Sequence, residues 1–215
     1  MENFIVANPF QHATEVVAGI DLSLSCPAIC VVPVNTSNDI TLPLSACQIY
    51  YLTDTRSRVI ETPNIHGELM GSWSNETQRY ESIADWAVAV VMRNTVVAIH
   101  LEAHALTTRN PLSFIKLVEN AALLKYLLYK AAIPVMTIPP SVIKKFATGH
   151  GNAKKDQMVG RFEAEQGVNL RQLFGLKSTV KTTSPLHDIV DSYYIAMMAR
   201  MNSVGESIIY NGIKA

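Results

Sequence analysis

The chain has 215 residues, of which 48% are hydrophobic, and its 18 basic side chains balance 18 acidic ones. This length and apolar content favour one α/β domain with a substantial core over two complete domains. Because the sequence has neither a leader-like N-terminus nor a run of about 18 apolar residues, we expect a soluble, intracellular protein with no membrane association.

The first part of the chain predicts the beginning of a sheet. Short runs rich in β-branched residues at 17–23 and 28–34 predict an antiparallel pair of strands, and 47–53 predicts a third strand. Segment 35–76 is otherwise rich in polar residues, Gly and Pro, and it predicts loops or a partly ordered insertion. We place the domain at residues 17–204, between an N-terminal extension (1–16) and a C-terminal tail (205–215).

Helices and strands then alternate. Apolar residues spaced three and four apart predict an amphipathic helix from Thr77 to about Asn94, and VVAIHLE predicts a buried strand that ends at Glu102. A long helix starts at Pro111, the strand PVMTI follows, and residues 141–204 are mostly helical in pattern. This order predicts an α/β fold with a mixed five-stranded sheet flanked by helices.

Four acidic residues stand where burial or repulsion would make an ionised carboxylate costly. Asp21 lies in the apolar run GIDLSLS, and Glu102 closes an apolar strand. Asp188 and Asp191 are three residues apart in one helix, so they share a face. Each acid alone also suits an ordinary role, such as capping a turn or interacting with the helix dipole.

If these four carboxylates converge, they form an oxygen-rich site suited to Mg²⁺ or Mn²⁺. Two such ions can activate a water molecule and stabilise a departing 3′ oxygen, so the predicted chemistry is phosphodiester hydrolysis that leaves 5′-phosphate and 3′-hydroxyl ends. His100, Glu102 and His104 also alternate along one strand, but HLEAH lacks the helical spacing of an HExxH zinc site.

The net charge of zero taken alone argues against a nucleic-acid-binding protein, but the charge is unevenly distributed along the chain. Residues 141–200 hold nine basic and five acidic side chains (9 − 5 = +4), whereas residues 1–140 hold eight and twelve (8 − 12 = −4). A basic segment is typical of a DNA-binding surface, and also of an ordinary solvated face. The three cysteines, at positions 26, 30 and 47, have no CxxC spacing and are predicted to be reduced and buried.

The sequence resembles the RuvC family of Holliday junction resolvases, which have a ribonuclease H-like fold. The resemblance covers roughly residues 17–200 in family order. It is carried by four segments, GIDLSLS (19–25), AIHLEAHAL (98–106), PPSVIKKFATGHGNAKKDQMV (139–159) and HDIVDSYYIAMM (187–198).

The resemblance implies a metal-dependent endonuclease that acts on four-way DNA junctions as a homodimer. Asp21, Glu102, Asp188 and Asp191 would be the metal-binding catalytic acids. Lys144, Lys154 and Lys155 would contact DNA, with Gly149 and Gly151 allowing close approach of the backbone. The helix that contains KLVENAALLKYLLYK occupies the position of the family's main dimer-forming helix.

The sequence departs from the family where an aromatic residue commonly follows the second acid and wedges into the junction. Here EAHAL offers Leu106 as an aliphatic wedge, or as a core residue. Three alternatives stay open: a broader flap or branched-DNA endonuclease, a non-catalytic ribonuclease H-like DNA-binding module, and an actin-like ATPase. The length of the chain disfavours the ATPase, which needs two subdomains around a nucleotide cleft.

Overall fold

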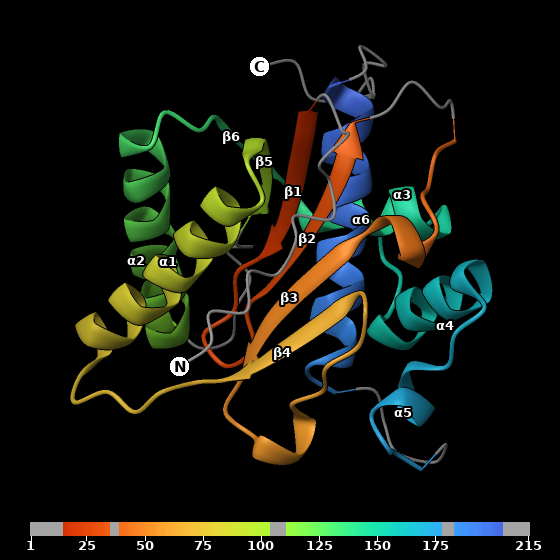
Figure 1. Cartoon of the computed structure of the whole chain (residues 1–215), viewed down its shortest axis with the longest axis horizontal. Coiled ribbons are helices and arrows are strands. Elements are labelled where there is room, and N and C mark those ends of the chain that lie inside the picture. Colours follow the sequence, from red (N-terminus) through yellow and green to blue (C-terminus); the bar gives the residue numbers. More distant parts are fainter. Residues whose placement is uncertain (1–14, 35–38, 104–110, 178–182, 204–215) are drawn as a thin grey trace, which may run out of the picture.

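The computed structural model describes residues 15–34, 39–103, 111–177 and 183–203, which form one mixed sheet covered by helices (Figure 1). The strands follow the spatial order β4-β3-β2-β1-β5-β6. They are β1 (Glu15–Asp21), β2 (Ala28–Val34), β3 (Gln48–Thr53), β4 (Ile65–Leu69), β5 (Val96–Glu102) and β6 (Val135–Ile138). The helices are α1 (Glu76–Arg93), α2 (Pro111–Lys130), α3 (Pro140–Thr148), α4 (Lys155–Gln166), α5 (Leu170–Leu173), α6 (Leu186–Ser203) and the short 3-10 helices η1 (Leu44–Ala46) and η2 (Arg56–Arg58).

The predicted α/β class is confirmed, but the sheet of the described residues has a sixth strand where five were expected. β1, β2 and β3 are antiparallel neighbours, and β5 and β6 run parallel to β1. The additional strand, β4, pairs parallel with β3 inside the segment predicted as loops. Its sequence, IHGEL, has one buried residue, Ile65, and a central Gly67. No alternation of apolar and polar side chains therefore marks it as a strand.

Each face of the sheet has its own apolar core. On one face, α3, α4 and α6 pack around Val17, Cys30 and Ile49. On the other face, α1 and α2 cover Ala18 and Ile20 (Figure 1). Because side chains alternate across a strand, β1 contributes to both cores, and apolar burial on both sides is the main favourable term in folding. The three cysteines are buried and free, as predicted.

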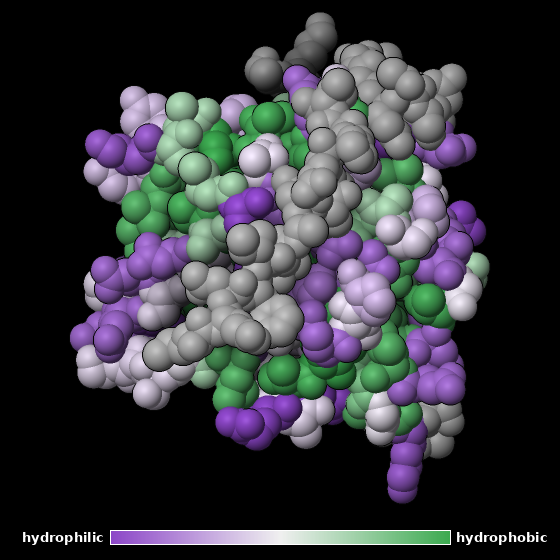
Figure 2. All heavy atoms as spheres, viewed as in Figure 1, coloured by the Kyte–Doolittle hydropathy of each residue, from purple (hydrophilic) through white to green (hydrophobic). Residues whose placement is uncertain are grey.

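The described residues cover most of the predicted domain and little of the predicted terminal segments. β1 begins at Glu15 and α6 ends at Ser203, while most of the predicted extension (1–16) and all of the predicted tail (205–215) lie outside the described residues. Those boundaries stay predictions. Among the described helices, none combines the length and apolar character needed to cross a bilayer. Figure 2 shows hydrophilic residues interspersed with apolar ones over the visible face.

α6 lies against β1 at a distance that leaves no room for a side chain at Gly19. A Cβ atom at this position would lie 2.1 Å from the backbone nitrogen of Ala196 and 2.5 Å from the carbonyl oxygen of Ser192. Both atoms belong to the backbone of a helix, which cannot give way as a flexible side chain can. Gly19 therefore sets the depth at which α6 docks on the sheet.

We expect Gly19→Ala to lower the free energy of unfolding by about 3 kcal/mol or more, because overpacking against backbone forces α6 away from β1. Urea denaturation monitored by circular dichroism measures this change. Gly160→Ala is the matched control, because Gly160 lies within α4 with nothing within 4 Å of its would-be Cβ. It should be neutral or stabilise by up to about 1 kcal/mol. Equal stability of the two variants would contradict the role assigned to Gly19.

Candidate active site

Two of the predicted acids end neighbouring parallel strands. Asp21 is the last residue of β1 and Glu102 the last residue of β5, and Ile20 pairs with Leu101 in the parallel register between them. The carboxyl ends of adjacent parallel strands meet at one edge of a sheet, where sites of α/β proteins commonly form. Since side chains alternate along a strand, Asp21 lies on the same face as Gly19, which is the face covered by α6.

The other two acids lie at the beginning of α6. Asp188 belongs to the first turn and is only 3% exposed, and Asp191 follows it by three residues and is half-buried. The predicted helix over this segment is confirmed, and its three-residue spacing puts both carboxylates on one face. We call Asp21, Glu102, Asp188 and Asp191 the acidic cluster.

Burial and neighbouring negative charge raise the pKa values of Asp21, Glu102 and Asp191. Burial raises the pKa of Asp21 well above its ordinary value, and the charges of the other three acids raise it further. Burial, followed by the charges of Glu102 and Asp188, raises the pKa of Asp191 to about 7. Burial also raises the pKa of Glu102, against the lowering effect of its hydrogen bond with Asp21. The four carboxylates therefore interact electrostatically, and like charges so close together favour bound protons or cations.

Two lysines offset part of this negative charge. Lys155, the first residue of α4, lowers the pKa values of Asp21, Glu102 and Asp191. Lys144 of α3 also lowers the pKa values of Glu102 and Asp191. Lys144 and Lys155 thus lie within electrostatic range of the acidic cluster. Lys154 is the exposed N-cap residue of α4, and its charge is not among the largest effects on the pKa values of the cluster.

The predicted glycines form the turn between the two lysine-bearing helices. Gly149 ends α3 in the left-handed conformation, with φ of 81°, which an L side chain rarely adopts. A Cβ atom on Gly151 would lie 3.1 Å from the carbonyl oxygen of Ser141. The two glycines therefore allow α3 to turn sharply into α4, and a lysine of each helix acts on Glu102 and Asp191.

The residues of the cluster fit a divalent cation in donor chemistry, though they are not closed into a cage. The Oδ2 atom of Asp188 is buried and has no hydrogen-bond partner, which is costly for an ionised carboxylate unless a cation compensates it. Within residues 15–34, 39–103, 111–177 and 183–203, however, no three His, Cys, Asp or Glu side chains form a ready-made metal-binding group. A bound cation would therefore require the carboxylates to lie closer together than they do in this structure.

The remaining predicted positions have different outcomes. Leu106, the predicted wedge, and His104 lie outside the described residues. His100 is buried next to the end of α6, where its Nε2 lies 3.3 Å from Nδ2 of Asn202. Burial lowers the pKa of His100 to about 4. His100 is therefore a neutral core residue at neutral pH.

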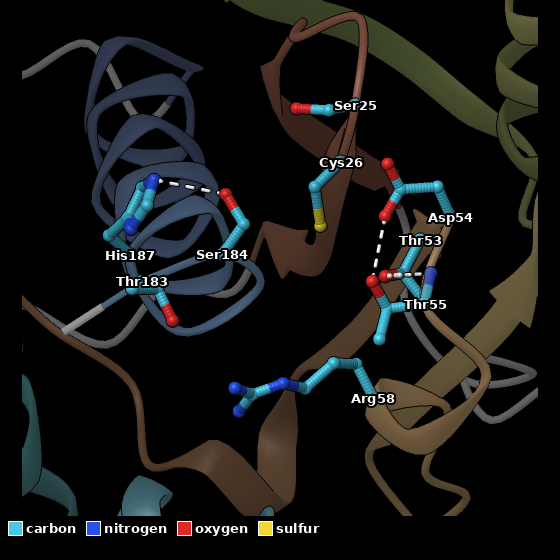
Figure 3. Close-up of a pocket in the computed structure, with 9 residues that line it drawn as sticks. All are labelled: Ser25, Cys26, Thr53, Asp54, Thr55, Arg58, Thr183, Ser184 and His187. Atoms are coloured by element: carbon cyan, nitrogen blue, oxygen red, sulfur yellow. Dashed lines mark hydrogen bonds between the residues drawn. The ribbon is translucent and has the colours of Figure 1, made fainter. Parts of the chain in front are cut away.

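A pocket of about 620 Å³ opens beside the acidic cluster, and sequence reasoning missed it (Figure 3). Cys26, whose Sγ points into this pocket, is hydrogen-bonded to Asp188. His187 lines the opposite wall, with Nε2 3.4 Å from Oδ1 of Asp188. Arg58 of η2 extends into the pocket from a segment predicted as loops. Only a prediction of the three-dimensional path of that segment could have found Arg58.

Comparisons with known proteins identify the fold. No protein-family model and no curated protein matches the chain. The Thermus thermophilus RuvC structure is 22% identical, with a TM-score of 0.55 over 89% of this chain and 97% of that one. T. thermophilus RuvC in complex with a Holliday junction substrate is 21% identical, with a TM-score of 0.57 over 88% of this chain and 97% of that one. The yeast mitochondrial Holliday junction resolvase Ydc2 is 16% identical, with a TM-score of 0.50 over 91% of this chain and 82% of that one. The chain therefore has the RuvC-like form of the ribonuclease H-like fold.

Proposed function

We propose that this protein is a structure-specific DNA endonuclease that resolves four-way junctions. The observation that carries the proposal is the acidic cluster, in which carboxylates from β1, β5 and α6 lie close enough for their charges to interact, at one edge of a RuvC-like sheet. Two solved structures of this fold with TM-scores of 0.50 or more are a RuvC bound to a Holliday junction and a mitochondrial Holliday junction resolvase. Fold alone does not determine function, so the site carries the argument.

The acidic cluster would hold Mg²⁺ or Mn²⁺, with two ions per site in the proposed form. Hard oxygen donors suit these ions, and the unpartnered Oδ2 atom of Asp188 is a ready ligand. When bound, the ions would supply activation of the attacking water and stabilisation of the leaving 3′ oxygen, giving 5′-phosphate and 3′-hydroxyl ends. Glu102 and Asp191 are less buried than Asp21 and Asp188, so a DNA phosphate would approach the cluster from their side.

Lysines 144 and 155 would act on the phosphate rather than on the ions. Both side chains stabilise negative charge at the cluster, as their effects on the pKa values of Glu102 and Asp191 show. With DNA present, the same ammonium groups would bind phosphate oxygens and orient the scissile group towards the carboxylates. Lys154, which is exposed beside Lys155, would contact the phosphate backbone further out.

We propose that α2 forms the interface of a homodimer. Five apolar side chains are exposed along one stripe of this helix with spacings of three, three, eight and three residues, namely Leu112 (70%), Ile115 (50%), Val118 (43%), Tyr126 (57%) and Tyr129 (78%). An amphipathic helix normally buries such a stripe, and an exposed one is typical of an interaction site. A two-fold dimer would also match the two-fold symmetry of a four-way junction and place one acidic cluster on each of two opposed strands.

We expect Tyr129→Glu to convert the dimer into a monomer, because a charge at the most exposed aromatic of the stripe would be desolvated in the interface. Sedimentation velocity over a range of protein concentrations measures the mass. Met92→Glu is the matched control, since Met92 is 56% exposed but lies at the end of α1 rather than on the α2 stripe. A wild-type protein that stays monomeric at cleavage concentrations would contradict the proposed dimer.

Cleavage mapping tests the proposed function directly. The wild-type protein is incubated with labelled four-way junctions, flaps and linear duplex, in Mg²⁺ or in chelator, and the cuts on every strand are mapped. Paired nicks related by the two-fold symmetry of the junction, and abolished by chelator, are the expected result. If the protein cuts flaps in preference to four-way junctions, the proposed substrate changes to branched DNA in general. Binding without cleavage in Mg²⁺ would leave only a DNA-binding module.

A further inference from the structure

The pocket beside the acidic cluster has the size and lining of a ligand site. Its volume of about 620 Å³ lies within the range typical of small-molecule pockets. It is lined by residues of β3 and η2 on one side and by the segment leading into α6 on the other (Figure 3). Its lining residues are mostly hydroxyl-bearing or charged, and none of those described is Phe, Tyr or Trp. The pocket therefore suits a polar group better than a stacked base.

Arg58 is held at this pocket by a fixed backbone. The hydroxyl of Tyr51 donates a hydrogen bond of 2.6 Å to the carbonyl oxygen of Arg58 and accepts one of 3.0 Å from the backbone N–H of Ile60. Tyr51 is fully buried, and its ring passes where Gly67 of β4 leaves space, because a Cβ atom there would lie 2.3 Å from the hydroxyl. Tyr51 and β4 thus fix the backbone from which the side chain of Arg58 extends into the pocket.

The guanidinium of Arg58 has unused hydrogen-bonding capacity. Its Nη1 atom is buried without a hydrogen-bond partner, and Arg58 forms no salt bridge with any carboxylate in the described part of the chain. The acidic side chain at this pocket is Asp54, which is exposed and whose Oδ1 accepts a hydrogen bond of 2.9 Å from the hydroxyl of Thr55. A buried donor without a partner is costly, so an oxyanion that accepts from Arg58 would be stabilised.

The position of the pocket relates it to the scissile phosphate. Cys26 and His187 line the pocket and contact Asp188 of the acidic cluster, so the pocket and the cluster share a wall. A DNA strand whose scissile phosphate lies at the cluster must place a neighbouring phosphate nearby. On this basis we infer that Arg58 binds a phosphate of the cut strand that flanks the scissile phosphate, and so positions that strand for cleavage. The inference rests on the proposed nuclease function.

Single-turnover cleavage of a four-way junction in Mg²⁺ tests this inference, with Arg58→Gln compared with Arg56→Gln. Arg56 lies in the same 3-10 helix but is exposed and does not line the pocket. We expect Arg58→Gln to lower the rate constant by about 10-fold to 100-fold, the effect of one charge-assisted hydrogen bond, and Arg56→Gln to stay within about 2-fold. Thermal unfolding midpoints within about 2 °C of wild type would show that both variants fold.

Methylphosphonate substitution identifies the phosphate. Each phosphate flanking the mapped cut is replaced in turn by the uncharged methylphosphonate, and cleavage is measured for wild type and both variants. At one flanking position, the methylphosphonate should lower the cleavage rate constants of the wild-type protein and Arg56→Gln by the same factor by which Arg58→Gln lowers the rate on the unmodified junction. At that position the methylphosphonate should not lower the rate constant of Arg58→Gln any further. Additive losses at every position, or equal rates for the two variants, would overturn the inference and leave the nuclease intact. A wild-type protein that cuts no junction would overturn the proposed function and the inference with it.

Discussion

Replacing Asp188 by Asn is expected to lower the rate constant for junction cleavage by about 10³-fold or more. The substitution keeps the size of the side chain and removes its charge. Asp188 is 3% exposed, and although its Oδ1 atom lies 3.4 Å from Nε2 of His187, its Oδ2 atom is buried without a hydrogen-bond partner. If the acidic cluster binds cations, the substitution removes a charged ligand and weakens binding of the cations that would drive hydrolysis. If Asp188 is only a partner of the helix dipole, the change should affect stability and not rate.

Junction binding separates these two roles. Asp188→Asn should bind a four-way junction in chelator at least as tightly as wild type, because removal of a negative charge does not weaken attraction to phosphate. Asp85→Asn is the matched control, since Asp85 is exposed on α1, on the opposite face of the sheet. Single-turnover rates in Mg²⁺ and gel-shift titrations in chelator provide both measurements. Cleavage by Asp188→Asn within tenfold of wild type would remove this residue from the catalytic set.

Local pattern predicted the strands and the helix that carry the four acids, although the strand predicted at 17–23 ends at Asp21 and the roles of the acids remain predictions. Asp21 and Glu102 could be placed because each ends a run of buried residues, and parallel strands bring such ends together. Asp188 and Asp191 could be placed because helical spacing is periodic. In both cases the relevant interactions are encoded within about ten residues of chain, which is the range that sequence periodicity covers.

The pocket could not be predicted in this way, because its geometry depends on contacts between distant positions. Arg58 reaches the pocket only because Tyr51 binds its carbonyl oxygen, and Tyr51 has room only because Gly67 lacks a side chain. None of these residues belongs to a periodic pattern. The same holds for Gly19, whose importance follows from the close approach of α6, 173 positions later at Ser192 (192 − 19). Tertiary packing, and not local propensity, determines these features.

The metal-free protein should lose stability as the pH rises, and Asp191 should account for a large part of the loss. Burial and neighbouring charge raise the pKa of Asp191 from an ordinary value of 3.8 to about 7. Between these values the folded state retains a proton that the unfolded state has released. The contribution of the protonated group is therefore complete below pH 3.8 and is lost as the pH rises through about 7. A shift of this size corresponds to a loss on the order of 4 kcal/mol.

Buried histidines act in the opposite direction and must be separated from this effect. Burial lowers the pKa values of His100 and His187, so their contributions to stability increase as the pH rises towards their ordinary value of 6.5. The comparison of wild type with Asp191→Asn cancels them, because both proteins contain the same histidines. In chelator, the variant should gain stability relative to wild type by up to a few kcal/mol between pH 4 and 8. Asp85→Asn should follow wild type throughout.

Divalent cation should reverse the sign of this difference. Mg²⁺ or Mn²⁺ bound by the acidic cluster displaces the protons and compensates the carboxylate charges, so the wild-type protein should be stabilised at pH 8 more than Asp191→Asn. Urea denaturation at pH 5, 6.5 and 8, with chelator or with saturating Mg²⁺, measures both effects. A difference between the two proteins that is independent of pH without metal would mean that Asp191 is ionised in the folded state. A difference that metal does not change would mean that Asp191 is not a ligand.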